Sequence, residues 1–123
     1  MITFKRKWNH KCFDESGTRM GPEGKSLARS FHNMMSRVCA GIGAKVVKKS
    51  TGHYDVSGFI QRRDGSLVYY SWGDFRMFGR IDVDACDACV GVLLRTVEST
   101  TDYHGGCNNF SSISDLSKKI PQI

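Results

Sequence analysis

The sequence has little proline, the residue that interrupts helices and strands most strongly. Only two of its 123 residues are proline, and its five cysteines are an odd number. No apolar run approaches the roughly 18 residues of a membrane span. No apolar stretch of about 7 to 15 residues follows the basic amino terminus, as it would in a secretory signal. We therefore expect a cytoplasmic protein without membrane contact, whose cysteines are free thiols or metal ligands rather than a disulfide framework.

The composition also excludes several classes of protein. Hydrophobic residues make up 40% of the chain and charged residues 24%, so the sequence is neither a disordered tail nor a collagen-like repeat. A chain of this length folds as one domain that buries about two-thirds of its unfolded surface. We expect a single domain over residues 1–123, in which residues 1–20 form a basic arm or an edge strand before the breaker at residues 21–24.

The familiar catalytic motifs are absent. The sequence has no G-x-S-x-G, Walker loop, H-E-x-x-H or Gly-rich nucleotide fingerprint. An enzyme would need a site that folding alone assembles from polar residues at loops or strand ends, namely His53, Asp55, Asp74, Arg76, Arg95, Asp102 and His104. Such residues more often cap turns or form ion pairs. We predict no catalytic residue and keep a small enzyme with a loop-built site as an alternative.

Positive charge is concentrated in the first part of the chain. The whole sequence carries a formal net charge of +6, but residues 1–50 hold eleven Lys and Arg against three acidic residues. Residues 51–123 hold seven Lys and Arg against nine acidic residues, so this part is slightly acidic. Such a polarised field attracts phosphates or an acidic protein face, although it also serves solubility.

Residues 25–40 show the strongest helical periodicity in the chain. At roughly 100° per residue, one sector holds Leu27, Phe31, Met34, Met35 and Val38. The opposite sector holds Lys25, Arg29, His32, Asn33, Ser36 and Arg37. Gly41 and Gly43 mark the end of this helix, where a left-handed residue without a Cβ commonly forms the cap.

After this helix the hydrophobic period changes from 3.6 to 2. Short β-branched or aromatic runs predict strands over residues 44–49, 54–60, 67–70 and 90–97, the last of them inside the sheet. Asp64-Gly65 predicts an antiparallel hairpin, and residues 112–115 resemble a capping box that starts a short C-terminal helix. The predicted fold is α+β: one amphipathic helix packed on an antiparallel sheet of about four or five strands, with a short C-terminal helix.

The polar side of the predicted helix could follow a phosphate backbone while its apolar side packs on the sheet. Together with other basic clusters, it supplies the candidate contacts to nucleic acid or a partner: Lys5, Arg6, Lys7, Lys25, Arg29, Arg37, Lys48, Lys49, Arg62 and Arg63. Trp8, beside the first cluster, could stack on a base or pack in the core. The alternative for all of these charges is an ordinary solvated surface.

Two short ligand pairs raise the question of a zinc site. Cys86 and Cys89 form a C-x2-C pair, and His104 and Cys107 form an H-x2-C pair further along the chain. This spacing suits tetrahedral zinc, although buried thiols are also common core residues. A redox pair is disfavoured, because no βαβ context surrounds it and no basic neighbour lowers a thiol pKa. We expect no metal and no cofactor, and zinc remains the alternative.

The order of these segments resembles that of small proteins of uncharacterised activity carried by phages, plasmids and conjugative elements. The resemblance covers most of residues 25–120. It rests on Gly52-His53-Tyr54-Asp55-Val56-Ser57-Gly58-Phe59, on Val68-Tyr69-Tyr70-Ser71 leading to Asp74-Phe75-Arg76, on Leu94-Arg95-Thr96, and on Asp102-Tyr103-His104-Gly105-Gly106-Cys107-Asn108-Asn109-Phe110. His104 and Cys107 stand where small hydroxyl residues are expected, and the Cys86/Cys89 pair is an addition, which weakens the zinc interpretation.

This resemblance implies a mobile-element context, from which a functional hypothesis follows. A small basic protein of this kind, without catalytic motifs, acts by binding. We predict inhibition of a host nucleoprotein defence complex in the host cytoplasm, with an anti-CRISPR inhibitor as one form. The basic surface would contact guide RNA, target DNA or an acidic protein face, and the partner would be the host nuclease or its RNA–protein complex. The alternatives are an accessory protein that binds DNA or RNA directly and the small enzyme described above.

Overall fold

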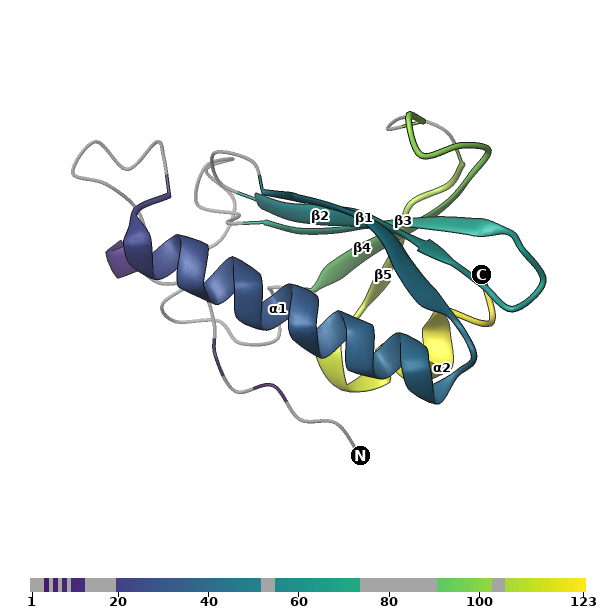
Figure 1. The fold of residues 1–123 in the computed structure, drawn as a ribbon, viewed down its shortest axis with the longest axis horizontal. Helices are drawn as coiled ribbons and strands as arrows, with labels where there is room; N and C mark the ends of the chain where they lie inside the picture. The colour runs from purple at the N-terminus through teal and green to yellow at the C-terminus, as the bar shows by residue number, and fades with distance from the viewer. Residues whose placement is uncertain are drawn as a thin grey trace.

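The computed structural model describes residues 4, 6, 8, 10–12, 20–51, 55–73, 91–102 and 106–123. Its elements are η1 (His10–Cys12), α1 (Pro22–Gly41), β1 (Lys45–Thr51), β2 (Asp55–Gln61), β3 (Leu67–Gly73), β4 (Val92–Val97), β5 (Asn109–Ser111), η3 (Ile113–Asp115) and α2 (Leu116–Lys119). The strands form one antiparallel sheet in sequence order, and α1 lies across one face of it (Figure 1). This arrangement confirms the predicted α+β fold. No helix within the described residues has the length and apolar content that a membrane crossing requires.

Helix α1 begins slightly before the predicted start and ends where the glycines indicate. Pro22 lies in its first turn, where a missing backbone N–H costs no helical hydrogen bond. At the other end Gly43 has a φ of 73°, a left-handed conformation that residues with a Cβ rarely adopt. Ala44 then donates its backbone N–H to the carbonyl of Cys39 at 2.9 Å, which closes the helix.

The apolar side of α1 packs on the sheet as predicted. All five residues of the predicted apolar sector are buried: Leu27, Phe31, Met34, Met35 and Val38. They share one core with buried side chains from the sheet, among them Val56, Ile60, Val68, Tyr70, Trp72, Val92 and Leu94. The core therefore lies between α1 and the sheet face that α1 covers.

The prediction that His32 lies on the exposed side of α1 is wrong. Its side chain is only 6% exposed, because the imidazole reaches the hydroxyl of Tyr70 on β3. Position 32 falls at the margin of the buried sector, beside Ala28 and Cys39, so a polar partner on the sheet is sufficient to draw it inward.

The turn between β2 and β3 confirms the predicted hairpin. The backbone N–H of Arg62 donates to the carbonyl of Ser66 at 2.8 Å. Asp64 accepts the backbone N–H of Ser66 at 2.9 Å, and Gly65 has a φ of 89°. An Asp side chain that bonds the backbone two residues later, followed by a glycine with positive φ, is the chemistry that favours such turns.

The described residues near the amino terminus pack against α1 and β3. The ring of Phe4 lies edge-on to those of Phe31 and Trp72, with centroids 5.8 and 5.6 Å away. Trp8 is fully buried, and its ring centroid lies 5.1 Å from that of Trp72. Trp8 is therefore a core residue, and the interpretation that it stacks on a nucleic-acid base is wrong.

The chain ends in the predicted short helix without the predicted capping box. Ser112 makes no side-chain cap hydrogen bond, and its hydroxyl pairs with that of Ser114 at 3.1 Å. Leu116 and Ile120 are fully buried, and α2 contacts α1. This helix therefore depends on packing more than on capping.

We expect Phe31→Ala to destabilise the protein by about 3 to 5 kcal/mol. The ring of Phe31 is fully buried and stacks on Trp72 with 4.4 Å between centroids. Chemical denaturation measures the loss. Asn33→Ala, on the exposed side of the same helix, is the control and should change the free energy of unfolding by no more than about 0.5 kcal/mol. An unchanged stability of Phe31→Ala would contradict the placement of α1 on the sheet.

Candidate nucleic-acid interface

The exposed side of α1 carries a regular row of polar and basic side chains. Lys25, Arg29, Asn33 and Arg37 are all exposed and follow one another at four-residue steps. Each step advances about 6 Å along the helix axis, so the row is about 18 Å long. These side chains lie on the side of α1 opposite its buried residues, and so point away from the sheet.

Arg6 adds a positive charge beside this row. Its Nη1 donates to the hydroxyls of Ser26 at 3.2 Å and Ser30 at 2.8 Å. The packing of Phe4 and Trp8 on either side of Arg6 in the sequence holds this segment against the core. We call the surface formed by Arg6, Lys25, Arg29 and Arg37 the basic α1 face.

The basic α1 face has a net positive charge. Glu23 is the only acidic residue of α1. Lys25 and Arg29 lie about 6 Å apart along the helix axis, within the Debye length of about 10 Å at 0.1 M salt, so their potentials add in the solvent in front of the helix. Arg6 lies beside the same turns, on Ser26 and Ser30, and Arg37 is about 12 Å beyond Arg29. Such a surface attracts anions, and above all a polymer with regularly repeated negative charges.

Sequence patterns do not identify Ser26 and Ser30 as parts of this face. The signal was present in their spacing, because residues four apart are neighbours on a helix surface. Each follows one of the basic residues Lys25 and Arg29 by one position. The spacing does not indicate that Arg6 is their partner, because Arg6 is 20 and 24 residues away in the sequence and meets them only in the folded chain.

Among the other predicted contact residues, those that the structure describes do not join the basic α1 face. Lys5 and Lys7 lie outside the described residues. Lys48 and Lys49 belong to β1, and Arg62 and Arg63 lie at the turn between β2 and β3. The fold therefore divides the basic residues among α1, an edge strand and a hairpin turn.

Lys48 takes part in a row of side chains on the sheet face opposite α1. The strand register pairs Lys48 with Phe59 and Phe59 with Tyr69, and Tyr69 in turn pairs with Arg95. Lys48 Nζ lies 5.7 Å from the ring centroid of Phe59, and Arg95 Cζ lies 5.8 Å from that of Tyr69, within cation–π range. Both rings are buried, at 1% and 9% exposed, so the row offers no open stacking surface.

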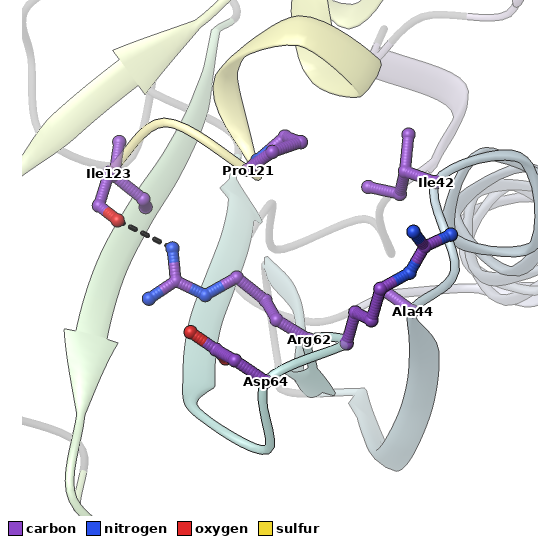
Figure 2. A pocket seen from close by; sticks show the side chains of 7 residues that line it. Ile42, Ala44, Arg62, Asp64, Pro121 and Ile123 are labelled. Atoms are coloured by element: carbon purple, nitrogen blue, oxygen red, sulfur yellow. Dashed lines mark hydrogen bonds between the residues drawn. The ribbon is translucent and has the colours of Figure 1, made fainter.

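Arg62 connects the hairpin turn to the C-terminal segment. Its Nε donates to the Ser66 hydroxyl at 2.8 Å, and its Nη1 donates to the carbonyl oxygens of Ile120, at 3.2 Å, and Ile123. Figure 2 shows the bond to Ile123 at the side of a pocket. Nε and Nη1 of Arg62 are therefore engaged within the fold.

This pocket lies where the end of α1 meets the turn and the C-terminal segment (Figure 2). Its volume is about 370 Å³, and it is lined by Ile42, Ala44, Arg62, Arg63, Asp64, Pro121 and Ile123. The guanidinium of Arg63 lies against Gly43, where a Cβ would come within 2.6 Å of it. The pocket thus combines apolar walls with charges of both signs, at the end of α1 opposite to Lys25.

A buried polar pair joins α1 to the sheet. Nδ1 of His32 lies 2.6 Å from the hydroxyl of Tyr70. Burial lowers the pKa of His32; the nearby backbone of Ser50 opposes this shift, and the charge of Lys49 adds to it. Burial also raises the pKa of Tyr70, so its hydroxyl keeps its proton and can donate it to Nδ1. Nε2 of His32 is buried and makes no hydrogen bond to any described residue.

Gly58 leaves the space that this pair needs. A Cβ at this position would come within 2.6 Å of the Tyr70 hydroxyl and 2.5 Å of the Lys48 carbonyl oxygen. Burial raises the pKa of the neighbouring thiol of Cys39 to about 12, so this thiol stays protonated at neutral pH and is a poor nucleophile. His32, Tyr70 and Cys39 therefore hold α1 on the sheet through burial and the hydrogen bond between His32 and Tyr70.

Most residues considered for catalysis lie outside the described part of the chain: His53, Asp74, Arg76 and His104. Asp55 begins β2. Arg95 Nε donates to Asn108 Oδ1 at 2.8 Å, and Asp102 Oδ2 accepts the backbone N–H of Glu98 at 3.4 Å. The described candidates thus take part in strands and turns.

Of the four candidate zinc ligands, only Cys107 is described, and it is exposed. Cys86, Cys89 and His104 lie outside the described residues. In the part of the chain that the structure describes, no three His, Cys, Asp or Glu side chains lie close enough together to hold a metal ion.

The fold and the basic α1 face define a small α+β protein with one cationic helix surface. No protein-family model, curated protein or solved structure matches the chain. Its function is therefore inferred from its own residues.

We expect the free energy of unfolding to fall as the pH is lowered below 6.5, the ordinary pKa of histidine. In this range the unfolded chain binds a proton at His32 that the folded protein does not, which favours unfolding. Above this range His32 is neutral in both states and contributes nothing. Urea denaturation from about pH 7.5 to 5 should show a smaller loss in His32→Gln than in the wild type. Equal losses would show that His32 is protonated in the folded protein.

Proposed function

We propose that this protein is a small binding protein whose basic α1 face contacts the phosphate backbone of a nucleic acid within a host nucleoprotein defence complex. The resemblance to mobile-element proteins implies only a mobile-element context, and the step from that context to an inhibitor of the anti-CRISPR type is our own hypothesis. The observation that carries the proposal is the fixed position of Arg6, whose guanidinium is held by Ser26 and Ser30. A cation that is ordered before binding loses less conformational entropy on contact than a free side chain does.

The make-up of this face favours a phosphate backbone over an acidic protein surface. Stable protein interfaces are built around a buried apolar or aromatic centre. The exposed row of α1 consists of Lys25, Arg29, Asn33 and Arg37, and the large apolar side chains of the helix are buried. Binding through this face is therefore electrostatic, and a nucleic-acid backbone supplies the regularly repeated negative charges that it requires.

A direct DNA- or RNA-binding accessory protein would use the same face. The two roles differ in the partner, because an inhibitor binds the host nuclease in its RNA–protein complex more tightly than it binds free nucleic acid. A small enzyme would depend instead on loop residues such as Asp74, Arg76 and His104, which lie outside the described part of the chain.

Charge reversal on the basic α1 face should weaken nucleic-acid binding without unfolding the protein. In Lys25→Glu/Arg29→Glu we expect the affinity for a mixed-sequence nucleic acid to fall at least about tenfold, and the slope of log affinity against log salt to shrink by about 2. The melting temperature should change little, because both residues are exposed. Fluorescence anisotropy over a salt series and thermal denaturation measure the two effects.

Lys118→Glu/Lys119→Glu is the matched control, because it makes the same change in net charge on exposed residues of α2. Helix α2 lies near the C-terminal end of α1, whereas Lys25 and Arg29 lie near its N-terminal end (Figure 1). Equal losses of affinity in the two variants would show that binding follows net charge alone, which contradicts a defined contact face.

In cells with an active CRISPR system, the wild-type protein should restore the plating of a targeted phage, and Lys25→Glu/Arg29→Glu should not. The assay uses one strain for each CRISPR type, each with a spacer against the same phage, and an untargeted phage controls for general effects on growth. If the wild type binds nucleic acid but protects the phage in no strain, the accessory-protein alternative replaces the inhibitor.

A further inference from the structure

Among the residues that the structure describes, the basic α1 face carries charges but no exposed aromatic ring, and this combination narrows the form of nucleic acid that it can bind. We infer that this face binds a double-stranded segment along its phosphates rather than a single strand by base stacking. The inference rests on the proposed function and specifies the ligand of the same face.

Proteins commonly bind single strands through aromatic side chains on which successive bases stack. Near the basic α1 face these rings are occupied in the core: Trp8 and Phe31 are fully buried, and Phe4 packs edge-on against Phe31. Among the described residues, the largely exposed aromatic ring is Phe110, at 60%. It belongs to β5, where it pairs with Leu93, and so lies in the sheet layer. Within the described residues, the basic α1 face therefore has no stacking surface.

A duplex also matches the rigidity of this face. The cations of α1 are fixed on one helix at axial steps of about 6 and 12 Å, and Arg6 is held beside them by Ser26 and Ser30. A duplex presents its phosphates at fixed positions, one for about every 3.4 Å of axis on each strand. The fixed cations of the basic α1 face therefore meet fixed phosphates. A single strand must lose backbone freedom on the same surface, and no aromatic ring among the described residues of this face compensates for that loss by stacking.

The Arg6 side chain on the flank of α1 opposes entry of this helix into a groove. A helix with its side chains is about 10–12 Å across, and the major groove of B-DNA is about 12 Å wide. The contacts of Arg6 with Ser26 and Ser30 place its guanidinium on the flank of α1, which makes the charged surface wider than a helix alone. The face therefore contacts phosphates rather than base edges. Binding is independent of base sequence and tolerates both A-form and B-form duplexes.

Fluorescence anisotropy with labelled oligonucleotides of about 20 nucleotides tests this inference. The probes are a DNA duplex, an RNA duplex, an RNA–DNA hybrid and the corresponding unstructured single strands, each in two unrelated sequences. We expect the duplexes to bind at least tenfold more tightly than the single strands, with similar affinities for the two sequences. Four phosphate contacts predict a slope of log affinity against log salt of about −3.6.

Two variants separate the position of Arg6 from its charge. Ser26→Ala/Ser30→Ala leaves the net charge unchanged but releases the guanidinium, and should weaken duplex binding severalfold while leaving single-strand binding unchanged. Arg6→Gln removes one cation and should reduce the salt slope for duplexes by about 0.9.

Tighter binding of single strands than of duplexes would overturn the inference and leave the proposed function intact. A strong preference for one sequence would likewise overturn contact through phosphates alone. Failure to bind any probe, or wild-type affinity in Lys25→Glu/Arg29→Glu, would overturn the proposed function itself.

Discussion

The stacking of Phe31 on Trp72 is the contact on which the rest of the structure depends. The two rings lie 4.4 Å apart between centroids and within 14° of parallel, and they join α1 to β3. Phe4 packs edge-on against both rings, and Trp8 packs against Trp72, so these two residues from the N-terminal part of the chain pack on the same pair. Because Phe4 and Trp8 flank Arg6 in the sequence, apolar packing beneath α1 also positions a charge on its surface.

A polar contact interrupts this apolar layer. His32 and Tyr70 form a hydrogen bond between α1 and the sheet, and Gly58 leaves room for the tyrosine ring. Apolar burial has no directional preference, whereas a shift of α1 along β3 would leave both polar groups buried and unpaired, which is costly. The pair therefore selects one position of the helix on the sheet.

Positive charge serves two different purposes in this protein. Arg62 donates to carbonyl oxygens of the C-terminal segment, and Lys48 lies over the ring of Phe59. These side chains are held by contacts within the fold. Lys25 and Arg29, by contrast, project from a helix whose opposite side forms the core, so a ligand can contact them without disturbing any packing. A count of basic residues therefore overstates the extent of a binding surface.

Local patterns in the sequence determined α1, strands β1 to β4 and the hairpin turn, but not η1 or β5. The period of α1, the alternation in the strands and the Asp64-Gly65 turn depend on residues close together in the chain, and the structure confirms them. Only the tertiary structure decided the environment of individual side chains. The period of α1 cannot anticipate that His32 has a partner on β3, 38 residues away, or that Arg6 meets Ser30, 24 residues away. Burial and hydrogen bonding depend on which surfaces the folded chain brings together, so Trp8 became a core residue and Arg6 a fixed surface charge.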